Sequence, residues 1–394
     1  MTNPSLALQA FESIKNVLAD IPKPIALHEP WIKGQEWNYV KSCLDSGWVS
    51  YLGEYVQRFE NDLAKYTGVK SAIAVSSGTA ALHVCCLLAG VLPGDEVLLP
   101  SLSFVATANA VTYCGGIPHF VDVNETTLGV DPENLRNHLA KSTVAIKGGG
   151  RRNKVSGNRI VALIVMHTFG QPSDLEQLES VCSEFGLTMI EDAAESLGTF
   201  YKGKHTGNWG KISALSFNGN KVVTTGGGGA IITNDVELAK KAKHLTTTAK
   251  VPHKWELKHD AIGFNYRLAN VNAAIGCAQL EAIEEFITLK RELTSKYLQA
   301  LHGISGLKVF QEVAGARSNY WLNAVIFDSA NAKELPHLLK LLHDDGILAR
   351  PSWIPLHQLV MYSSSPRMDL TTTESLALRI VNLPSSPQLL RKRS

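Results

Sequence analysis

Short apolar runs of β-strand type alternate with helical patterns up to about residue 245, and this alternation limits the fold of the chain more than any other feature. The runs are apolar at nearly every position, which is typical of strands in a parallel sheet that is covered on both faces. We therefore predict an α/β fold with a large, mixed but mostly parallel, seven-stranded sheet covered by helices. The predicted strands are Ser71–Val75, Glu96–Leu99, Pro118–Val121, Ile160–Met166, Leu187–Glu191, Ser213–Phe217 and Ala230–Thr233.

Helical patterns fill the segments between these strands. They lie at Thr79–Ala89, Ala106–Tyr113, Pro132–Ala140, Asp174–Phe185 and Val236–Leu245. Ligands of such sheets bind outside the carboxyl ends of the strands. Residues that directly follow a predicted strand are therefore the first candidates for a functional site.

The C-terminal part follows a different pattern, which predicts a second and smaller α+β domain. A polar, His-rich stretch leads into GFNYRLANVNAA and a long helical pattern that ends near Ala300. We expect one domain over residues 1–265, which includes the N-terminal segment, and a second over residues 266–394, joined by the long helix. In the second domain we predict strands near Leu307–Phe310 and Trp321–Phe327, and helices near Ala332–Asp344 and Thr372–Val381.

Composition and charge exclude several classes of function. The formal net charge is +2, so no long-range field attracts DNA or an anionic membrane. Fully apolar runs such as Val161–Met166 are too short to span a membrane, and the N-terminus does not resemble a secretory signal. The six cysteines have no metal or redox spacing, so we expect reduced thiols, no metal site and a cytoplasmic protein. Residues 147–159 are Gly-rich and polar and predict a mobile loop.

Two segments place small or acidic residues directly after predicted strands. In SSGTAAL at 76–82, a strand passes into a helix. The free N–H groups near Thr79 favour an anion there, and Gly78 permits close approach of the backbone. A simple helix cap is the alternative. Asp192 follows another apolar strand, where its carboxylate could pair with a protonated ring nitrogen or cap a helix.

A third segment, SFNGNKVVTTGGGG at 216–229, places Lys221 in a turn after a strand rather than on a helix surface. A lysine held in a pocket forms an imine once burial or a neighbouring cation makes its amine neutral. The phosphate site, the acid for a ring nitrogen and the imine lysine follow one another along the chain, each at a strand end. This order predicts a site for a phosphorylated aromatic cofactor.

With these motifs the chain resembles the DegT/DnrJ-type nucleotide-sugar aminotransferases, which have the fold-type I architecture and use pyridoxal 5'-phosphate (PLP). The resemblance extends from about His28 to Pro387. PHKWELKHD at 252–260 and YKGKHTGNWG at 201–210 suggest the subgroup that aminates C4 of UDP-linked 4-keto-6-deoxy-N-acetylglucosamine in bacillosamine- and legionaminic-acid-type pathways. The matching stretches are SGWVSYLGEYVQRFE, SSGTAAL, LLPSLSFVATANAV, IEDAAESLG, SFNGNK and GFNYRLANVNAA.

The resemblance implies catalytic and ring-binding roles for matching positions. Lys221 would form the imine with PLP and move a proton between the substrate carbon and the cofactor. Asp192 would pair with the pyridine nitrogen, and Phe104 would stack on the ring. Glu195 would stand beside the cofactor, with a less defined role. Gly227 departs from the family, in which many members have Glu, and this loosens any substrate assignment tied to that position.

The resemblance also implies how the phosphate is bound. Gly78, Thr79 and Ser216 would hold it, together with Asn265 from the neighbouring subunit. Shared sites of this kind imply a homodimer. Weaker candidates for substrate contacts are Trp48, Tyr51, His167, Lys254 and Arg350, each with a packing or structural role as the alternative.

The implied function is a ping-pong transamination for the synthesis of surface polysaccharide sugars such as those of O-antigens. Glutamate would donate the amino group, and a UDP-linked keto sugar would accept it at C4. Amination at C3 and a PLP enzyme that acts on free amino acids remain alternatives. A non-catalytic ligand-binding regulator is the alternative from another class.

Overall fold

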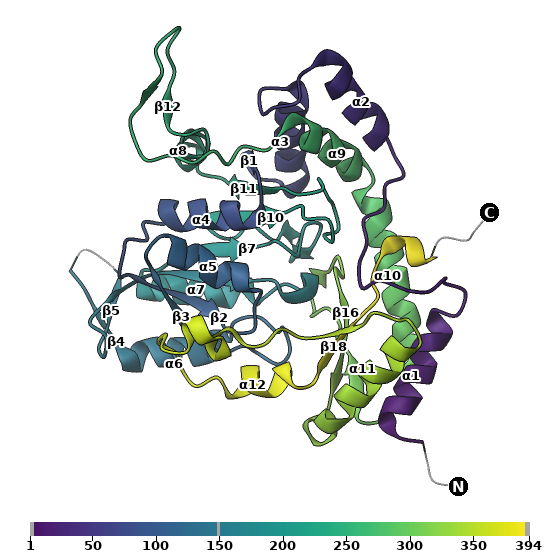
Figure 1. The fold of residues 1–394 in the computed structure, drawn as a ribbon. Coiled ribbons are helices and arrows are strands. Elements are labelled where there is room, and N and C mark those ends of the chain that lie inside the picture. The colour runs from purple at the N-terminus through teal and green to yellow at the C-terminus, as the bar shows by residue number, and fades with distance from the viewer. Residues whose placement is uncertain (1–3, 148–149, 391–394) are drawn as a thin grey trace.

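The centre of the molecule is a mixed nine-stranded sheet, in a computed structural model that describes residues 4–147 and 150–390 (Figure 1). Seven strands form its main path in the order β1-β11-β10-β7-β6-β2-β3, and β4 and β5 extend it beside β6. The bounds are β1 Ser71–Val75, β2 Glu96–Pro100, β3 Ile117–Val121, β4 Thr143–Ala145, β5 Arg151–Asn153, β6 Arg159–Met166, β7 Thr188–Asp192, β10 Ile212–Ser216 and β11 Gly229–Thr233.

The strand directions confirm the expected mostly parallel arrangement. Each neighbouring pair from β10 through β7, β6 and β2 to β3 is parallel, whereas β11 is antiparallel to both β1 and β10. Because β11 is reversed, the carboxyl ends of β1, β10, β7 and β2 share one edge of the sheet. Each of the seven predicted strands is present within one residue of its expected ends.

Helices cover both faces of the sheet because alternate strand residues point to opposite sides. In β2, Val97 and Leu99 pack in a core with α4, α5 and α8, whereas Leu98 packs on the other side with α6 and α7. The helices of the larger part are α2 Glu36–Ser46, α3 Glu54–Thr67, α4 Gly78–Leu88, α5 Val105–Tyr113, α6 Pro132–Ser142, α7 Leu175–Phe185, α8 Val236–Thr246 and α9 Asn270–Glu281.

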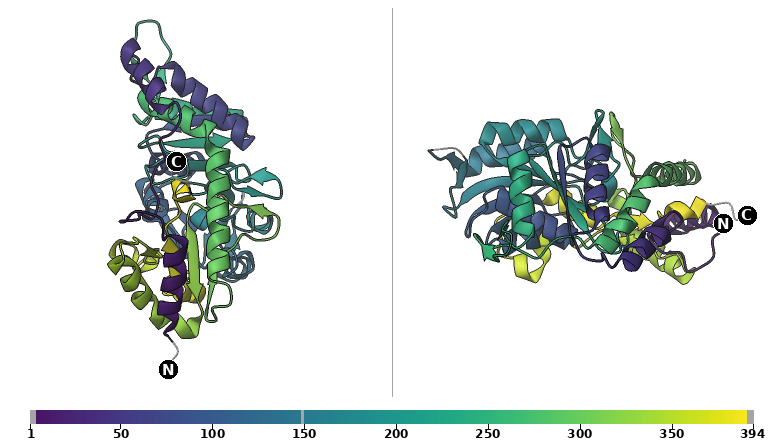
Figure 2. Two further views of the ribbon diagram at one scale, coloured as in Figure 1. Left: turned by 90° about the vertical axis from the view of Figure 1, so that its right-hand side faces the viewer. Right: turned by 90° about the horizontal axis from the view of Figure 1, so that it is seen from above.

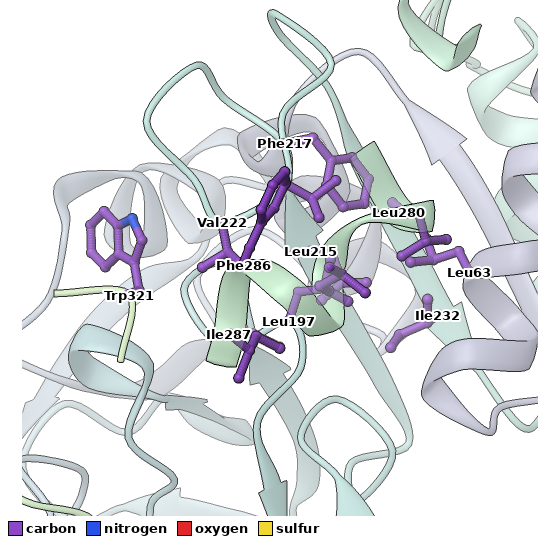
Figure 3. Packing of buried hydrophobic residues seen from close by; sticks show 14 of the residues in the cluster. Leu63, Leu197, Leu215, Phe217, Val222, Ile232, Leu280, Phe286, Ile287 and Trp321 are labelled. Carbon is purple, nitrogen blue, oxygen red and sulfur yellow. The ribbon is translucent and has the colours of Figure 1, made fainter. Parts of the chain in front are cut away.

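A third core lies under the helices at the sheet edge nearest β1. Figure 3 shows Leu63 of α3, Leu280 of α9 and Phe286 of the following helix packed with Leu215 of β10 and Ile232 of β11. Trp321 belongs to the same buried cluster and extends it to the candidate site.

The C-terminal part forms a smaller sheet with its own core. Its strand order is β14-β16-β18-β17, all antiparallel. The helix α10 runs along this part, with the N-terminal helix α1 beside its far end (Figure 2). The bounds are β14 Leu307–Val309, β16 Asn323–Phe327, β17 Arg350–Pro351, β18 Ile380–Leu383, α1 Leu6–Val17, α10 Ile283–Ala300, α11 Leu335–Asp344 and α12 Thr371–Ala377.

Two small sheets lie outside these layers. The strands β8, β9 and β15 pair near the larger sheet, and the hairpin β12–β13 projects from the body at the top of Figure 1. Within the described ranges, no helix is long and apolar enough to cross a membrane. The bounds are β8 Phe200–Tyr201, β9 Lys204–His205, β12 Lys250–Val251, β13 Lys258–His259 and β15 Ala316–Arg317.

Several local expectations are wrong. The long helical pattern is interrupted at Ala282, which separates α9 from α10. The helix expected over Thr372–Val381 ends at Ala377, and Val381 lies in β18. The loop expected at 147–159 contains β5, which pairs with both β4 and β6; residues 148–149 lie outside the described residues.

The N-terminal segment also packs differently from the expected domain scheme. Side chains of α1, such as Ala10 and Ile14, lie in one core with α10, α11 and β16 of the C-terminal part. The division at residues 265 and 266 itself stays a prediction.

Candidate functional site

A cavity of about 630 Å³ lies at the shared carboxyl edge of the sheet, where parallel sheets bind their ligands. The segments that follow β1, β2, β7 and β10 supply one wall. Residues of β17 and β18 and the segment before α2 supply the opposite wall. The cavity therefore lies between the large sheet and the C-terminal part.

The start of α4 forms an anion-binding cradle on the sheet side of the cavity. Ser77 caps this helix, and its Oγ accepts a hydrogen bond from the N–H of Ala80 (3.0 Å). A Cβ added at Gly78 would lie 2.7 Å from Cβ of Ser216, so only glycine fits against β10. Free N–H groups and two hydroxyl residues, Thr79 and Ser216, border the same space.

Asp192 lies at the end of β7, buried at the floor of the cavity. Its Oδ2 accepts a hydrogen bond from Oγ1 of Thr107 (2.7 Å), and its Oδ1 accepts one from the N–H of Ala194 (3.2 Å). Burial raises the pKa of Asp192, and the hydrogen bonds and the charge of Lys221 oppose this shift. A cationic ligand atom at this position would favour the carboxylate.

Lys221 enters the cavity from the turn after β10, as its sequence context predicts. Its Nζ lies 3.4 Å from Oε1 of Glu195 and 3.8 Å from the centre of the Trp321 ring. The sequence analysis allowed for a neighbouring cation that would make the amine neutral. The structure instead places the carboxylate of Glu195 beside Nζ. Burial raises the pKa of Glu195 to about 7, although Lys221 and the N–H of Phe169 lower it.

Phe104 stands at the opening between β2 and α5, where it precedes the first residue of the helix. Its side chain is 52% exposed and lines the cavity. An aromatic ring left open at such a place has a free face for a planar ligand.

The structure brings most of the predicted site residues together and leaves others outside. Lining the cavity are Gly78, Thr79, Phe104, Asp192, Glu195, Ser216, Lys221 and Arg350. The cavity of the same chain does not include Trp48, Tyr51, His167, Lys254 and Asn265.

His167 has a supporting position instead of the expected contact with substrate. Its ring is fully buried, with Nε2 3.0 Å from Oε2 of Glu191, and its Nδ1 accepts a hydrogen bond from the N–H of Ser173 (3.3 Å). The structural alternative for this histidine therefore fits better than a ligand contact.

Sequence reasoning missed several residues of the cavity. Trp321 and Trp353 were hidden because they lie far from the strand-end motifs in the chain. Ser77 has the clearest signal, since a serine directly before a helix start is a common cap. The missed lining residues include Ser77, His28, Asn218, Asn220, Trp321, Trp353 and Asn382.

The donor set fits a phosphorylated pyridine cofactor. The Gly78 cradle leaves space that a side chain would fill, at a helix start that favours phosphate. The buried acid Asp192 and the amine of Lys221 line the same cavity, as a protonated ring nitrogen and an aldehyde carbon require.

Comparison with known proteins agrees with this geometry. The model of the DegT/DnrJ/EryC1/StrS aminotransferase family matches residues 30–393. A GDP-perosamine synthase of Escherichia coli O157:H7 is 37% identical over 93% of this chain and 94% of that protein. EpsN of Bacillus subtilis, provisionally described as a pyridoxal phosphate-dependent aminotransferase, is 38% identical over 85% of this chain and 83% of that protein.

A solved structure shows the same fold. The aminotransferase TlmJ from Streptoalloteichus hindustanus superposes with a TM-score of 0.82 at 30% identity, over 92% of this chain and 93% of that one. The expected fold-type I architecture, the PLP cofactor and the sugar aminotransferase class are confirmed, whereas the UDP-linked substrate is not. The chain belongs to the DegT/DnrJ/EryC1/StrS aminotransferase family.

Proposed function

We propose that this protein transfers an amino group from glutamate to the C4 keto carbon of a nucleotide-linked 4-keto-6-deoxy sugar. The observation that carries the proposal is the meeting of Lys221, Asp192 and the Gly78 cradle in one cavity at the sheet edge. Family membership supplies the reaction class, and the cavity supplies the groups that such a reaction needs.

Each of these groups has a task that its surroundings support. PLP, when bound, supplies an electron sink for the charge left on a substrate carbon that loses a proton. Asp192 keeps a ring nitrogen protonated, because its carboxylate is buried and oriented by Thr107. Lys221 binds the cofactor through Nζ and moves a proton at that atom, while Phe104 orients the ring.

The α4 start and Ser216 hold the phosphate in this proposal, and this anchoring leaves Nζ free to act. Glu195 lies within 3.4 Å of Nζ, where it can hold a proton near neutral pH. Arg350 on the opposite wall of the cavity offers a guanidinium to the carboxylate of glutamate or to a diphosphate.

The nucleotide distinguishes two candidates for the acceptor. The motifs at 201–210 and 252–260 favour a UDP-linked 2-acetamido-2,6-dideoxy-4-hexulose, as in bacillosamine and legionaminic acid pathways. The GDP-perosamine synthase relative favours a GDP-linked sugar aminated at C4 as the second candidate. Either product would enter surface polysaccharides such as O-antigens.

The decisive experiment is a product assay with the purified protein, PLP and glutamate. It is given the UDP-linked or the GDP-linked 4-keto-6-deoxy sugar, and the product is identified by mass and by its amination position. We expect an amino sugar from one of them and a Lys221→Ala variant that makes none. Amination at C3 would correct the position. Turnover of free amino and keto acids alone would contradict the proposal, as would a protein that binds no cofactor.

We also propose a homodimer with shared active sites in the cytoplasm. Asn265 is exposed near the base of the β12–β13 hairpin, outside the cavity of its own chain. Exposed apolar side chains that lie together are typical of interfaces. The six free, buried cysteines suit a reducing compartment. The large exposed apolar residues of the hairpin region and of the α2–α3 region are Trp37, Leu44, Trp48, Leu52, Trp255, Leu257 and Ile262.

A further inference from the structure

Two buried polar side chains on one wall of the cavity lack hydrogen-bond partners. His28 precedes α2 and is 9% exposed, Asn382 lies in β18 and is 3% exposed, and both line the cavity. Within residues 4–147 and 150–390, no partner is present for either ring nitrogen of His28 or for Oδ1 of Asn382. Such atoms have lost their hydrogen bonds to bulk water on folding. This loss is unfavourable unless a ligand or an ordered water supplies a new hydrogen-bond partner.

The backbone holds both side chains firmly in this wall. The two chain neighbours of His28 are hydrogen-bonded to residues 385 and 386, directly after β18. Asn382 is an interior residue of β18, paired between β16 and β17. The unpartnered atoms therefore belong to a rigid surface and not to a loose loop.

The ring of His28 is uncharged at neutral pH. Burial lowers its pKa well below 6.5, and the nearby charges of Lys290 and Lys221 lower this pKa further. A neutral imidazole has one N–H donor and one acceptor nitrogen. Together with Oδ1 of Asn382, the unpartnered atoms are two acceptors and one donor.

The balance of donors and acceptors decides which ligand group fits. A carboxylate or a phosphate has only acceptors and would leave the two unpartnered acceptors without a donor, whereas a hydroxyl group both donates and accepts. We propose that His28 and Asn382 bind hydroxyl groups of the sugar ring and so determine which sugars are aminated. This inference rests on the proposed function, because it assigns part of the same cavity to the acceptor.

The test separates the two half-reactions of the PLP-loaded protein. The variants His28→Phe and Asn382→Leu remove the polar atoms and keep much of the side-chain volume. We expect kcat/KM for the keto sugar to fall about 10- to 100-fold, as when a bound polar group loses its partners. The first half-reaction, in which glutamate changes the absorbance of the bound cofactor, should keep its rate.

Ser352→Ala is the matched control. Its Oγ is also buried and without a partner among the described residues, but Ser352 does not line the cavity, so both half-reactions should be unchanged. His28→Gln retains a donor and an acceptor and should recover part of the loss. Thermal unfolding shows which variants fold. If His28→Phe does not fold, Asn382→Leu tests the inference in its place.

The outcomes of the two half-reactions decide the inference. The acceptor assay uses whichever of the two sugars the wild-type protein aminates. The inference is overturned if folded variants lose the glutamate half-reaction equally, or lose neither. Failure of the proposed function looks different, because the wild-type protein itself would then aminate no sugar.

Discussion

Two acidic side chains only three positions apart, Asp192 and Glu195, meet the same cavity in different environments. Asp192 receives hydrogen bonds from Thr107 and from the N–H of Ala194, which favour its charged form. Glu195 is fully buried, and its pKa is raised to about 7 by that burial despite the nearby Lys221. Burial raises the pKa of both acids, and the pKa of Glu195 reaches about 7. Sequence alone does not show how deeply either acid is buried.

Glu195 should make the cofactor-free protein less stable as the pH rises. Its pKa is higher in the folded chain (about 7) than the ordinary value of 4.5, so the folded state binds more protons between these values. Stability then falls across this window by roughly 3 kcal/mol. Glu195→Gln removes this dependence. Urea unfolding of both proteins at about pH 5 and about pH 7.5 measures the difference.

The control is Glu179→Gln, because Glu179 is an exposed residue of α7. The stability of this variant should change with pH as that of the wild type does. A Glu195→Gln variant whose stability still falls as steeply as the wild type would show that other groups cause the decline.

Among the elements, α4 shows what sequence can and cannot predict. A start at Thr79 was predicted from SSGTAAL, because small residues after a strand mark a turn into a helix, and α4 begins one residue earlier, at Gly78. The close contact between Gly78 and Ser216 could not be predicted, because it depends on the parallel arrangement of β1 and β10 on either side of the reversed β11. The end of the helix predicted over Thr372–Val381 was wrong for a different reason. The apolar run that includes Val381 is short, and such a run fits a helix or a strand equally well.

Gly78→Ala should weaken cofactor binding. The new Cβ would lie 2.7 Å from Cβ of Ser216, so α4 must move away from β10 and the cradle opens. We expect the Kd for PLP to rise at least about tenfold, which corresponds to about 1.4 kcal/mol. Equilibrium titration of the cofactor-free protein measures it.

The second substitution Ser216→Gly removes the clashing atoms and should recover part of the affinity in the double variant. Gly219→Ala is the control, because nothing lies within 4 Å of an added Cβ there. If Gly78→Ala binds PLP as tightly as Gly219→Ala does, the cradle is not where the phosphate binds.

The hairpin β4–β5 replaces the expected mobile loop because a buried acid anchors it. Glu96 in β2 accepts hydrogen bonds from Nδ2 of Asn153 (3.0 Å) and from Ser156, and its Oε2 lies 2.7 Å from Nδ1 of His119. Burial raises the pKa of Glu96, but these hydrogen bonds outweigh it and leave the pKa lowered. A Gly-rich sequence gives no sign of such an anchor, since Glu96 lies far away in the chain.

Glu96→Ala should destabilise the fold without touching the site. It leaves Asn153, Ser156 and His119 without their acceptor, and we expect the free energy of unfolding to fall by about 3 kcal/mol. Urea denaturation measures it, with Glu179→Ala as an exposed control. Equal stabilities of the two variants would show that the hairpin is held by other contacts.

At the scale of the whole molecule, the fold followed from sequence more completely than the site did. The seven main strands were predictable because strands covered on both faces are apolar throughout. Apart from Arg350, the opposite wall of the cavity was not predictable, since Trp321, Trp353 and His28 reach it from three separate parts of the chain. The packing of α1 on the C-terminal part was hidden for the same reason.

Shared sites predict that two inactive variants restore each other. Lys221→Ala lacks the imine lysine, and Asn265→Ala lacks the residue that we propose to reach the partner's phosphate site. Mixed dimers then contain one site with both residues intact, so random reassociation should restore about a quarter of the activity. Activity after joint refolding, compared with each variant refolded alone, measures it. A mixture as inactive as its components would mean that Asn265 acts within its own chain or not at all.

The anchoring of α1 has a practical consequence for anyone who shortens this enzyme. Removing the first helix would strip Ala10 and Ile14 from the core that supports β16 and α11. The same core includes Val381 and Leu383, the two neighbours of Asn382 in the cavity wall. A trimmed version would therefore lose catalytic selectivity through damage that begins at the front end of the polypeptide, although the segment looks dispensable in the printed sequence.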